Sequence, residues 1–366
     1  MNSRKRLTSV LIFAIVVALI MSLSAGLKGC FRQTSSRTFF AADTVCTITV
    51  YGTNNEKALD GGVDLVLTLS NMLNCKDENS ELYKLNKTGE IKNPSVQLLE
   101  VINYGIYFSK EGNGIFDITV KPLSLLWDFK NETVPNKTEI SKALAKINYK
   151  NIEVSENSIT LKKGSEIDLG AIAKGYIAEK TIYFLEENGV KSGIVNLGGN
   201  VSVIGENGGK DFSVGIQNPF KEDIAATVKC RDMSVVTSGI YQRYFEKKGN
   251  IYHHLLNTKT GYPEENGLYS VTIISPSATS ADALSTLCFL QGLEKGREYI
   301  ENIKDAEAVF ITENYEIHLT SGLKKQGDII EILKGDTPQR NVLLRIVSKG
   351  TSIAGKRIGA VKKQAQ

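Results

Sequence analysis

The chain has 366 residues, of which 42% are hydrophobic and 23% are charged, and its formal net charge is +4. These values are typical of a globular chain long enough for two lobes or domains, and they exclude a mainly disordered protein. They also disfavour a nucleic-acid-binding core, because the excess positive charge lies largely at the two ends, in residues 4–6 and in Lys349, Lys356, Arg357, Lys362 and Lys363.

Residues 7–27 follow the basic start of the chain and contain no charged side chain. As a helix this segment would be roughly 30 Å long, which matches the hydrocarbon core of a membrane. Its most apolar part, residues 10–21, also has the length of a signal-peptide core, and residues 27–30 resemble a lipoprotein processing site, although Lys28 stands where a small residue is usual. Three alternatives stay open: a lipid on Cys30, an uncleaved membrane anchor, or plain secretion. All three export the rest of the chain, because the basic start should stay inside.

We therefore divide the chain into four parts. Residues 1–29 are a signal peptide or membrane anchor, residues 30–38 a linker, residues 39–335 the folded domain, and residues 336–366 a basic tail that we expect to be poorly ordered. The five cysteines, at positions 30, 46, 75, 230 and 288, are scattered and contain no Cys-x-x-Cys pair, so they predict neither a zinc site nor a disulfide scaffold. Buried free thiols are the simpler interpretation.

The folded domain is predicted to be α+β. Residues 43–51 alternate and are rich in β-branched side chains, which predicts a strand. Residues 56–73 and 98–111 carry apolar side chains at helical spacing. Residues 150–162 alternate as a hairpin does, and short strands punctuated by glycine are expected from residue 193 to about residue 319.

Three short segments are ambiguous when each is considered by itself. Residues 112–120, Gly-Asn-Gly-Ile-Phe-Asp-Ile-Thr-Val, indicate no more than a turn that enters a buried strand. The pair of glycines within residues 196–200 would let backbone approach a ligand closely, and a tight hairpin turn explains it equally well. Residues 235–239, which precede Tyr241, likewise fit either a ligand site or a tight turn.

A helix is predicted for residues 171–188, because its apolar side chains are periodic and Gly189 can cap it. The start of such a helix exposes free N–H groups just after Asp168. These donors, the positive end of the helix dipole and the ammonium group of Lys174 would together favour a bound pyrophosphate. The alternative is a surface lysine on an ordinary helix.

Two adjacent histidines, His253 and His254, fall in a predicted strand, residues 251–256. Alternation places them on opposite faces, so only one of them can face a given site. With an ordinary pKa of about 6.5, a neutral imidazole could accept a proton near neutral pH. The alternative is a core or interface histidine.

Asp282 and Thr286 stand four residues apart in a predicted helix, residues 281–290, and therefore project from the same face. One carboxylate and one hydroxyl form a sparse site of hard oxygens, which suits Mg²⁺ when substrate phosphates and waters complete its coordination. The alternative is structural: Ser280 would be the N-cap of the helix, and Asp282 would complement its dipole.

In their order along the chain, several of these segments resemble the FAD:protein FMN transferases, a family often written ApbE. The resemblance extends over roughly residues 39–333. One departure is visible, since Asn257-Thr258 stands where the family commonly has Asp-Pro. The segments that carry the resemblance are residues 167–176 (Ile-Asp-Leu-Gly-Ala-Ile-Ala-Lys-Gly-Tyr), 196–200 (Asn-Leu-Gly-Gly-Asn), 252–263 (Tyr-His-His-Leu-Leu-Asn-Thr-Lys-Thr-Gly-Tyr-Pro) and 280–286 (Ser-Ala-Asp-Ala-Leu-Ser-Thr), together with a polar corner at residues 80–86.

The resemblance implies a two-lobed fold with mixed or antiparallel sheets and flanking helices, preceded by the N-terminal membrane-targeting helix. It selects His254 rather than His253 as the base. The other site residues that it implies are FAD contacts at Ile115, Phe116, Asp117, Asp168 and Lys174, and Mg²⁺ ligands at the Ala171 carbonyl, Asp282 and Thr286.

The implied reaction is Mg²⁺-dependent transfer of FMN from FAD to a threonine hydroxyl of an acceptor protein, with release of AMP. Acceptors would be exported or membrane-bound redox subunits that carry an Asp/Ser/Thr-Gly-x-Ser/Thr sequence, and the enzyme would be anchored to the outer face of the cytoplasmic membrane. The chain lacks that sequence, so it is not expected to be its own acceptor. Two alternatives stay open: a Mg²⁺-dependent FAD pyrophosphatase, and a non-catalytic flavin-binding lipoprotein.

Overall fold

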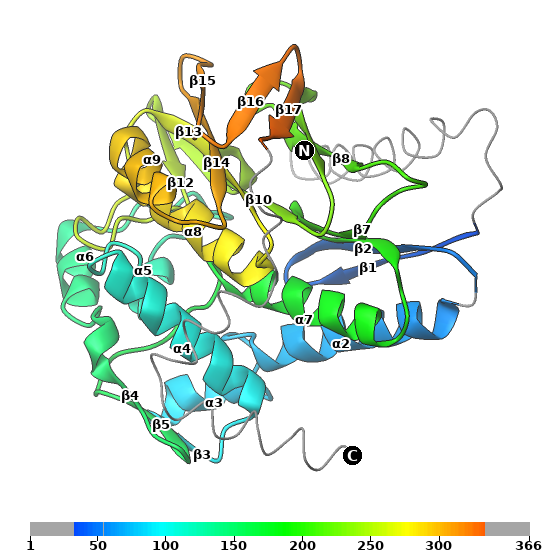
Figure 1. Ribbon diagram of the computed structural model, residues 1–366. Coiled ribbons are helices and arrows are strands. Elements are labelled where there is room, and N and C mark those ends of the chain that lie inside the picture. Colours follow the sequence, from blue (N-terminus) through cyan, green and yellow to red (C-terminus); the bar gives the residue numbers. More distant parts are fainter. Residues whose placement is uncertain (1–32, 54, 334–366) are drawn as a thin grey trace.

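Figure 1 shows the computed structural model of the protein, which describes residues 33–53 and 55–333. The membrane-targeting segment, Cys30 and the basic tail predicted from the sequence lie outside these residues. No helix within the described part is both long and apolar enough to cross a membrane.

An antiparallel sheet of eight strands forms the centre of the molecule. Its first two strands form a hairpin in which Thr34 pairs with Tyr51 and Ala41 with Thr44. In spatial order, the strands are β1 (Thr34–Ala41), β2 (Thr44–Tyr51), β6 (Ser192–Leu197), β7 (Asn200–Gly205), β10 (Ser234–Gly239), β13 (Leu268–Ser275), β14 (Glu307–Thr312) and β15 (Ile317–Leu319).

Alternation along the central strands places apolar side chains on both faces of this sheet. Val236 and Ile273 belong to a core shared with the helices, whereas Val235 and Ile274 belong to a second core on the opposite face. Successive residues of a strand point to opposite faces, so the continuous apolar runs in these strands indicate a sheet covered on both sides.

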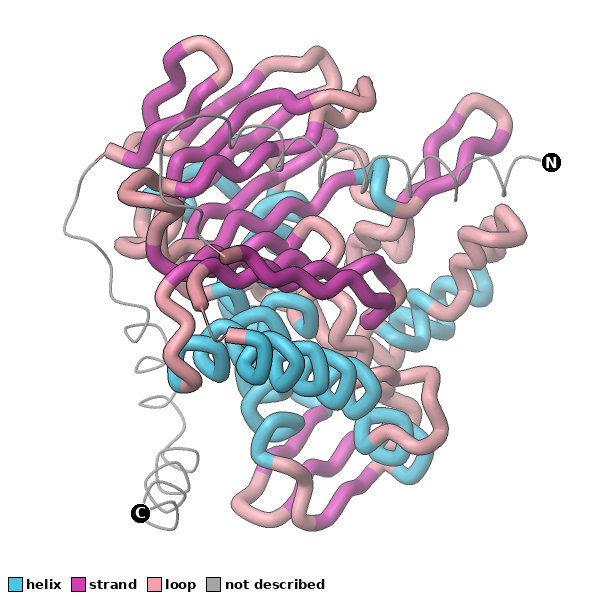
Figure 2. Tube along the Cα trace, turned by 90° about the vertical axis from the view of Figure 1, so that its right-hand side faces the viewer, coloured by secondary structure: helices cyan, strands magenta, loops and turns pink. Residues whose placement is uncertain are grey.

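Three helices, α2 (Glu56–Met72), α7 (Ala173–Glu187) and α8 (Ala278–Gln291), cover one face of the sheet, as Figures 1 and 2 show. Residues 278–290 of α8 are all buried, because this helix packs against β10 and β13 on one side and against α7 on another. Its apolar and small residues therefore surround the helix rather than form one stripe. The helices predicted for residues 56–73, 171–188 and 281–290 are confirmed, with ends that differ by at most three residues.

The opposite face is covered by a smaller sheet of four strands. Its spatial order is β16 (Leu323–Gln326), β17 (Ile329–Ile332), β9 (Ile224–Cys230) and β8 (Phe212–Gln217). The pairing of β17 with β9 is parallel, and the other pairings in this sheet are antiparallel. The predicted α+β class with mixed and antiparallel sheets is therefore confirmed.

Among the remaining elements, those within residues 81–111 and 150–162 form the lower part of the molecule in Figure 1. The hairpin predicted for residues 150–162 is confirmed as an antiparallel pair of strands. The remaining elements are the helices α3 (Glu81–Thr88), α4 (Val96–Glu111), α5 (Lys121–Ser124), α6 (Lys137–Leu144) and α9 (Leu293–Glu301), the sheet of β3 (Glu90–Lys92), β5 (Ser158–Leu161) and β4 (Ile152–Val154), and the hairpin of β11 (Tyr244–Lys247) and β12 (Asn250–His253).

The polar corner at residues 80–86 is the start of helix α3. Ser80 is its N-cap, and the Ser80 hydroxyl accepts a hydrogen bond from the backbone N–H of Tyr83. Asn86 accepts a hydrogen bond from the N–H of Ile167 at 2.7 Å and donates one to the carbonyl of the same residue at 2.9 Å. This polar side chain therefore fixes the backbone immediately before Asp168.

The linker predicted for residues 30–38 is wrong from Thr34 onward, because residues 34–38 are the first half of β1. This strand is an edge strand and most of its side chains are exposed, so it has no apolar alternation for sequence analysis to detect. Its partner β2 supplies the pairing that makes it a strand. The folded domain thus includes at least five residues that the sequence analysis left out.

The cysteines of the described part are free thiols, as predicted. Cys46, Cys230 and Cys288 are buried, whereas Cys75 is only half-buried. Burial raises the pKa of the Cys46 thiol to about 11 and that of the Cys230 thiol to about 12. These groups therefore stay protonated and unreactive at neutral pH.

Candidate active site

A cleft of about 2980 Å³ is lined by strands β1, β2, β6 and β7 of the large sheet and by β8 and β9 of the smaller one. Its walls come from the β1–β2 hairpin, the segment around residue 116, the start of α7, the end of β10, and α8. The cleft is lined by every residue that the sequence analysis placed in the site: Ile115, Phe116, Asp117, Asp168, Ala171, Lys174, His254, Asp282 and Thr286.

Asp282 is the link between the two helices that meet at this cleft. Helix α8 begins after Ser277, whose hydroxyl accepts a hydrogen bond from the N–H of Ser280, so the alternative in which Ser280 is the N-cap is wrong. Asp282 lies one turn further along the helix and is 4% exposed. Its Oδ2 accepts a hydrogen bond of 2.8 Å from the backbone N–H of Gly175, in the first turn of α7.

This hydrogen bond changes what the start of α7 can bind. In a continuous α-helix, the N–H of Gly175 would donate to the carbonyl oxygen of Ala171. Here that N–H donates to Asp282, α7 begins at Ala173, and the carbonyl of Ala171 has no hydrogen-bond partner among the described residues. A carbonyl oxygen is thus left free at the wall of the cleft, together with Oδ1 of Asp282.

Gly175 is required for this arrangement because α7 and α8 are in contact at this position. A Cβ atom at residue 175 would lie 2.3 Å from the carbonyl oxygen of Ala278 and 2.5 Å from the Cβ of Asp282. No side chain can therefore stand there unless the two helices move apart.

The carbonyl oxygen of Ala171, Oδ1 of Asp282 and the hydroxyl oxygen of Thr286 are a donor set that fits Mg²⁺. One carboxylate, one hydroxyl and one carbonyl are hard ligands, and they leave coordination positions for phosphate oxygens and water. Within the described residues, no group of three or more His, Cys, Asp or Glu side chains is placed to hold a metal. The set would therefore suit an ion that is held jointly by protein and substrate.

Two charged side chains flank the start of α7. Asp168 accepts hydrogen bonds from the N–H of Gly170 at 2.9 Å and from the hydroxyl of Ser124 at 2.9 Å, so its carboxylate shapes the loop before the helix. Lys174 lines the cleft, and no carboxylate of the described part lies within ion-pair distance of its ammonium group. The cleft therefore presents an unpaired positive charge, which suits an anionic ligand.

The segment that contains Ile115, Phe116 and Asp117 lines the cleft. Phe116 is 3% exposed and packs in the core. Asp117 accepts hydrogen bonds from Thr119 on one carboxylate oxygen and from the N–H of Tyr149 on the other. Burial raises the pKa of the Asp117 carboxyl, and these hydrogen bonds oppose that rise. Both oxygens already have partners in the protein, so this carboxylate mainly organises the loop.

Hydrogen-bond partners distinguish the two histidines. The Nε2 of His253 lies 3.1 Å from the carbonyl oxygen of Glu264, and its Nδ1 accepts from the N–H of Leu255 at 3.3 Å, so both ring nitrogens are used. In His254, Nδ1 lies 3.3 Å from the carbonyl oxygen of Arg243. A carbonyl can only accept, so this nitrogen carries the hydrogen and Nε2 keeps its lone pair. His254 lines the cleft and has an available basic nitrogen.

The pKa of His254 differs from the ordinary value assumed from the sequence. Burial, followed by the positive charge of Lys174, lowers it to about 3. The strand predicted for residues 251–256 ends at His253, so His254 belongs to the loop that follows β12. The imidazole is therefore neutral at physiological pH, as required of a base, but it is a weak base in the protein without ligand.

Comparison with known proteins identifies the family of the chain. The ApbE family model matches residues 42–310, which is more than half of the chain. The chain belongs to the ApbE family. The family recognised from the sequence motifs is therefore confirmed.

Several ApbE relatives are similar over most of their length. An FAD:protein FMN transferase from Klebsiella pneumoniae is 32% identical over 281 residues, which cover 73% of this chain and 86% of that protein. One from Treponema pallidum is 28% identical over 338 residues, which cover 84% and 93%. A crystal structure of an ApbE protein from Thermotoga maritima has a TM-score of 0.75 at 30% identity and covers 79% of this chain and 97% of that chain.

Hydrogen bonds hold the loop at Asn257 and Thr258, where the chain departs from Asp-Pro. Asn257 accepts from the N–H of Lys259 at 2.8 Å, which closes a tight turn. The hydroxyl of Thr258 donates to the carbonyl of Gly114 at 2.5 Å and so ties this loop to the segment that contains Phe116. The loop keeps a defined position without proline.

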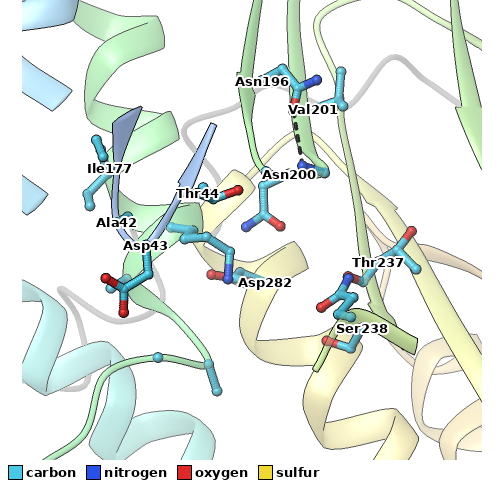
Figure 3. A pocket seen from close by; sticks show the side chains of 18 of the residues that line it. Ala42, Asp43, Thr44, Ile177, Asn196, Asn200, Val201, Thr237, Ser238 and Asp282 are labelled. Atoms are coloured by element: carbon cyan, nitrogen blue, oxygen red, sulfur yellow. Dashed lines mark hydrogen bonds between the residues drawn. The ribbon is translucent and has the colours of Figure 1, made fainter. Parts of the chain in front are cut away.

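The Asn-Leu-Gly-Gly-Asn segment of this ApbE protein is the turn between β6 and β7, where Gly198 and Gly199 have φ angles of 64° and 98°. The hairpin interpretation is therefore confirmed. A neighbour that the sequence analysis did not select is Asn200, which lines the cleft, is 2% exposed, and has a side-chain nitrogen without a hydrogen-bond partner among the described residues. Figure 3 shows its amide directed into the cleft. A buried polar group without a partner suits a site that receives a polar ligand.

The two histidines should make this ApbE protein sensitive to mild acid. Burial lowers the pKa of His253 to about 4 and that of His254 to about 3. Between pH 6.5 and 4 the unfolded chain binds these protons and the native protein does not, so stability falls as pH falls. At pH 5 we expect a loss of about 2 kcal/mol for His253 relative to pH 7.

Urea unfolding at pH 7, 6 and 5 measures this effect. The His254→Gln variant is the control, because it removes one of the two titrating groups and should reduce the slope of stability against pH. A free energy of unfolding that stays constant between pH 7 and pH 5 would contradict the lowered pKa values.

Proposed function

We propose that this protein transfers FMN from FAD to a threonine hydroxyl of an acceptor protein, with Mg²⁺, and releases AMP. Its membership of the ApbE family and its similarity to FAD:protein FMN transferases support flavin transfer between FAD and a protein. The observation that carries the finer proposal is the set of oxygens on Ala171, Asp282 and Thr286, which line one cleft with Lys174 and His254.

Each group has a distinct part in this proposal. Mg²⁺, when held by Ala171, Asp282 and Thr286, would offset negative charge on the pyrophosphate of FAD. The ammonium group of Lys174 would bind the same phosphates, since it has no ion pair in the described part of the chain. The protein thereby positions the phosphorus atom of the FMN half for attack.

His254 would accept the proton of the attacking threonine on Nε2. The threonine oxygen forms a bond to the FMN phosphorus, the bond from that phosphorus to the bridging oxygen breaks, and AMP leaves with the bond's electron pair. Burial, followed by the charge of Lys174, lowers the pKa of His254 in the protein without ligand. Bound phosphates would counter that charge, so FAD binding should raise the pKa of His254 toward its ordinary value and make it a better base.

The acceptor and the location are also parts of the proposal. The acceptor would be an exported or membrane-bound redox subunit with an Asp/Ser/Thr-Gly-x-Ser/Thr sequence. The enzyme would be held at the outer face of the cytoplasmic membrane by residues 7–27 or by a lipid on Cys30. These features rest on the sequence, because the N-terminal segment lies outside the described residues.

Incubation of the full-length chain with FAD, Mg²⁺ and an acceptor domain tests the proposal. Acceptor mass and in-gel flavin fluorescence are measured, with EDTA as the control for the metal. An acceptor heavier by one FMN, and unmodified when EDTA is present, supports the transferase. Free FMN and AMP with an unchanged acceptor would instead indicate a pyrophosphatase, and intact bound FAD a flavin-binding protein.

The His254→Ala variant tests the base. We expect the transfer rate to fall by about 10²- to 10⁴-fold, which is the usual contribution of a general base, while FAD binding changes little. The measurement pairs single-turnover transfer with FAD fluorescence quenching. Wild-type transfer rates in this variant would exclude His254 as the proton acceptor.

A further inference from the structure

A chain of two buried serines begins at the hydroxyl group of Thr286. Ser238, near the end of β10, has its Oγ 3.1 Å from Oγ1 of Thr286 and 2.7 Å from Oγ of Ser285. Ser285 donates in turn to the backbone carbonyl of Asp282 at 2.8 Å. Figure 3 shows Ser238 beside the helix that carries Asp282. Ser238 and Thr286 both line the cleft, and their exposed fractions are only 7% and 8%.

The number of hydrogens in this chain of hydroxyls fixes its direction. A hydroxyl has one hydrogen to donate. The hydrogen of Ser285 is committed to the carbonyl of Asp282, so Ser285 can only accept from Ser238. The hydrogen of Ser238 is then committed to Ser285, and Ser238 can only accept from Thr286. The hydrogen of Thr286 therefore points into the protein, toward Ser238.

This direction determines what Thr286 presents to the cleft. With its hydrogen turned away, the hydroxyl presents only lone pairs, which attract a cation and cannot donate to a phosphate oxygen. A hydroxyl free to rotate would present either its hydrogen or its lone pairs. The chain Thr286–Ser238–Ser285 thus orients Thr286 before any ligand binds, in the way that outer partners orient metal ligands in other sites.

We propose that Ser238 is a positioning residue that fixes Thr286 as a cation ligand. The inference rests on the proposed function, since it takes the Mg²⁺ position to lie at Asp282 and Thr286. It assigns a role to Ser238 and Ser285, which act through Thr286 and need not touch the substrate.

The test measures FAD binding by fluorescence quenching in the full-length chain while Mg²⁺ is titrated, and it needs neither acceptor nor turnover. Ser238→Ala removes the acceptor for the Thr286 hydrogen. We expect the Mg²⁺ concentration at the midpoint to rise by about 10- to 100-fold, with unchanged FAD binding in the absence of Mg²⁺. Ser285→Ala should also raise the midpoint, because Ser238 is then free to donate to Thr286.

Ser234→Ala is the matched control. Ser234 lies on the same strand, is buried, and shares a hydrogen bond of 2.8 Å with Ser202, but it does not line the cleft. Its removal should leave the Mg²⁺ midpoint unchanged. In a Thr286→Val background, Ser238→Ala should cause no further shift.

Three results would overturn the inference. One is a wild-type midpoint in Ser238→Ala, and another is an equal shift in Ser234→Ala, which would indicate general loosening of the strand. The third is an absence of any Mg²⁺ effect on FAD binding in the wild-type protein. Only the third result would also remove Mg²⁺ from the proposed function, so the two failures are distinguishable.

Discussion

The Asp282→Asn variant is expected to lose FMN transfer by at least about 100-fold while it stays folded. The amide oxygen of asparagine can still accept the hydrogen bond from the N–H of Gly175, so the link between α7 and α8 remains. What is lost is the negative charge beside the carbonyl of Ala171. Transfer rate, Mg²⁺ dependence of FAD binding, and thermal unfolding are the three measurements.

The Asp282→Ala variant is the comparison for that result. It removes both the charge and the acceptor, and leaves the N–H of Gly175 buried without a partner, which should cost about 1–3 kcal/mol. We expect Asp282→Ala to be less stable than Asp282→Asn and equally inactive. Substantial Mg²⁺-dependent transfer by Asp282→Asn would remove this carboxylate from the metal site.

The Gly175→Ala variant is expected to lose both stability and flavin binding. The added methyl group would lie 2.3 Å from the carbonyl oxygen of Ala278 and 2.5 Å from the Cβ of Asp282. Alanine is favoured over glycine in a helix by about 1 kcal/mol, but overpacking against backbone costs about 3 kcal/mol. The clash should dominate, separate α7 from α8, and displace Asp282. Urea unfolding and FAD titration measure the two effects.

Gly61→Ala is the matched control on helix α2. Its new methyl group would meet only the ring of Phe184, at 2.6 Å, and this half-buried side chain can move aside. We therefore expect a much smaller loss of stability and no effect on FAD binding. If Gly175→Ala bound FAD like the wild-type protein, close contact between α7 and α8 would not be required for the site.

The sequence was most informative where local patterns decide structure. Helix α7 and helix α8 were predicted because their apolar periodicity, capping residues and turn residues are local features. Strand β1 was missed because its side chains are mostly exposed, and the pairing with β2 that makes it a strand depends on a hairpin rather than on an apolar pattern. The strand that contains His253 was predicted to end at residue 256, but it ends at His253, three residues earlier.

For the site, the sequence identified the residues, and the structure showed how they are arranged. By itself, the sequence determined the family and which residues would line the cleft, because order and spacing of motifs are carried along the chain. Only the tertiary structure decided how those residues act: that Asp282 takes the N–H that would otherwise bond Ala171, that both oxygens of Asp117 are bonded within the protein, and that Ser238 lies against Thr286. Hydrogen-bond partners and burial arise between segments far apart in the chain, so spacing along the sequence cannot specify them.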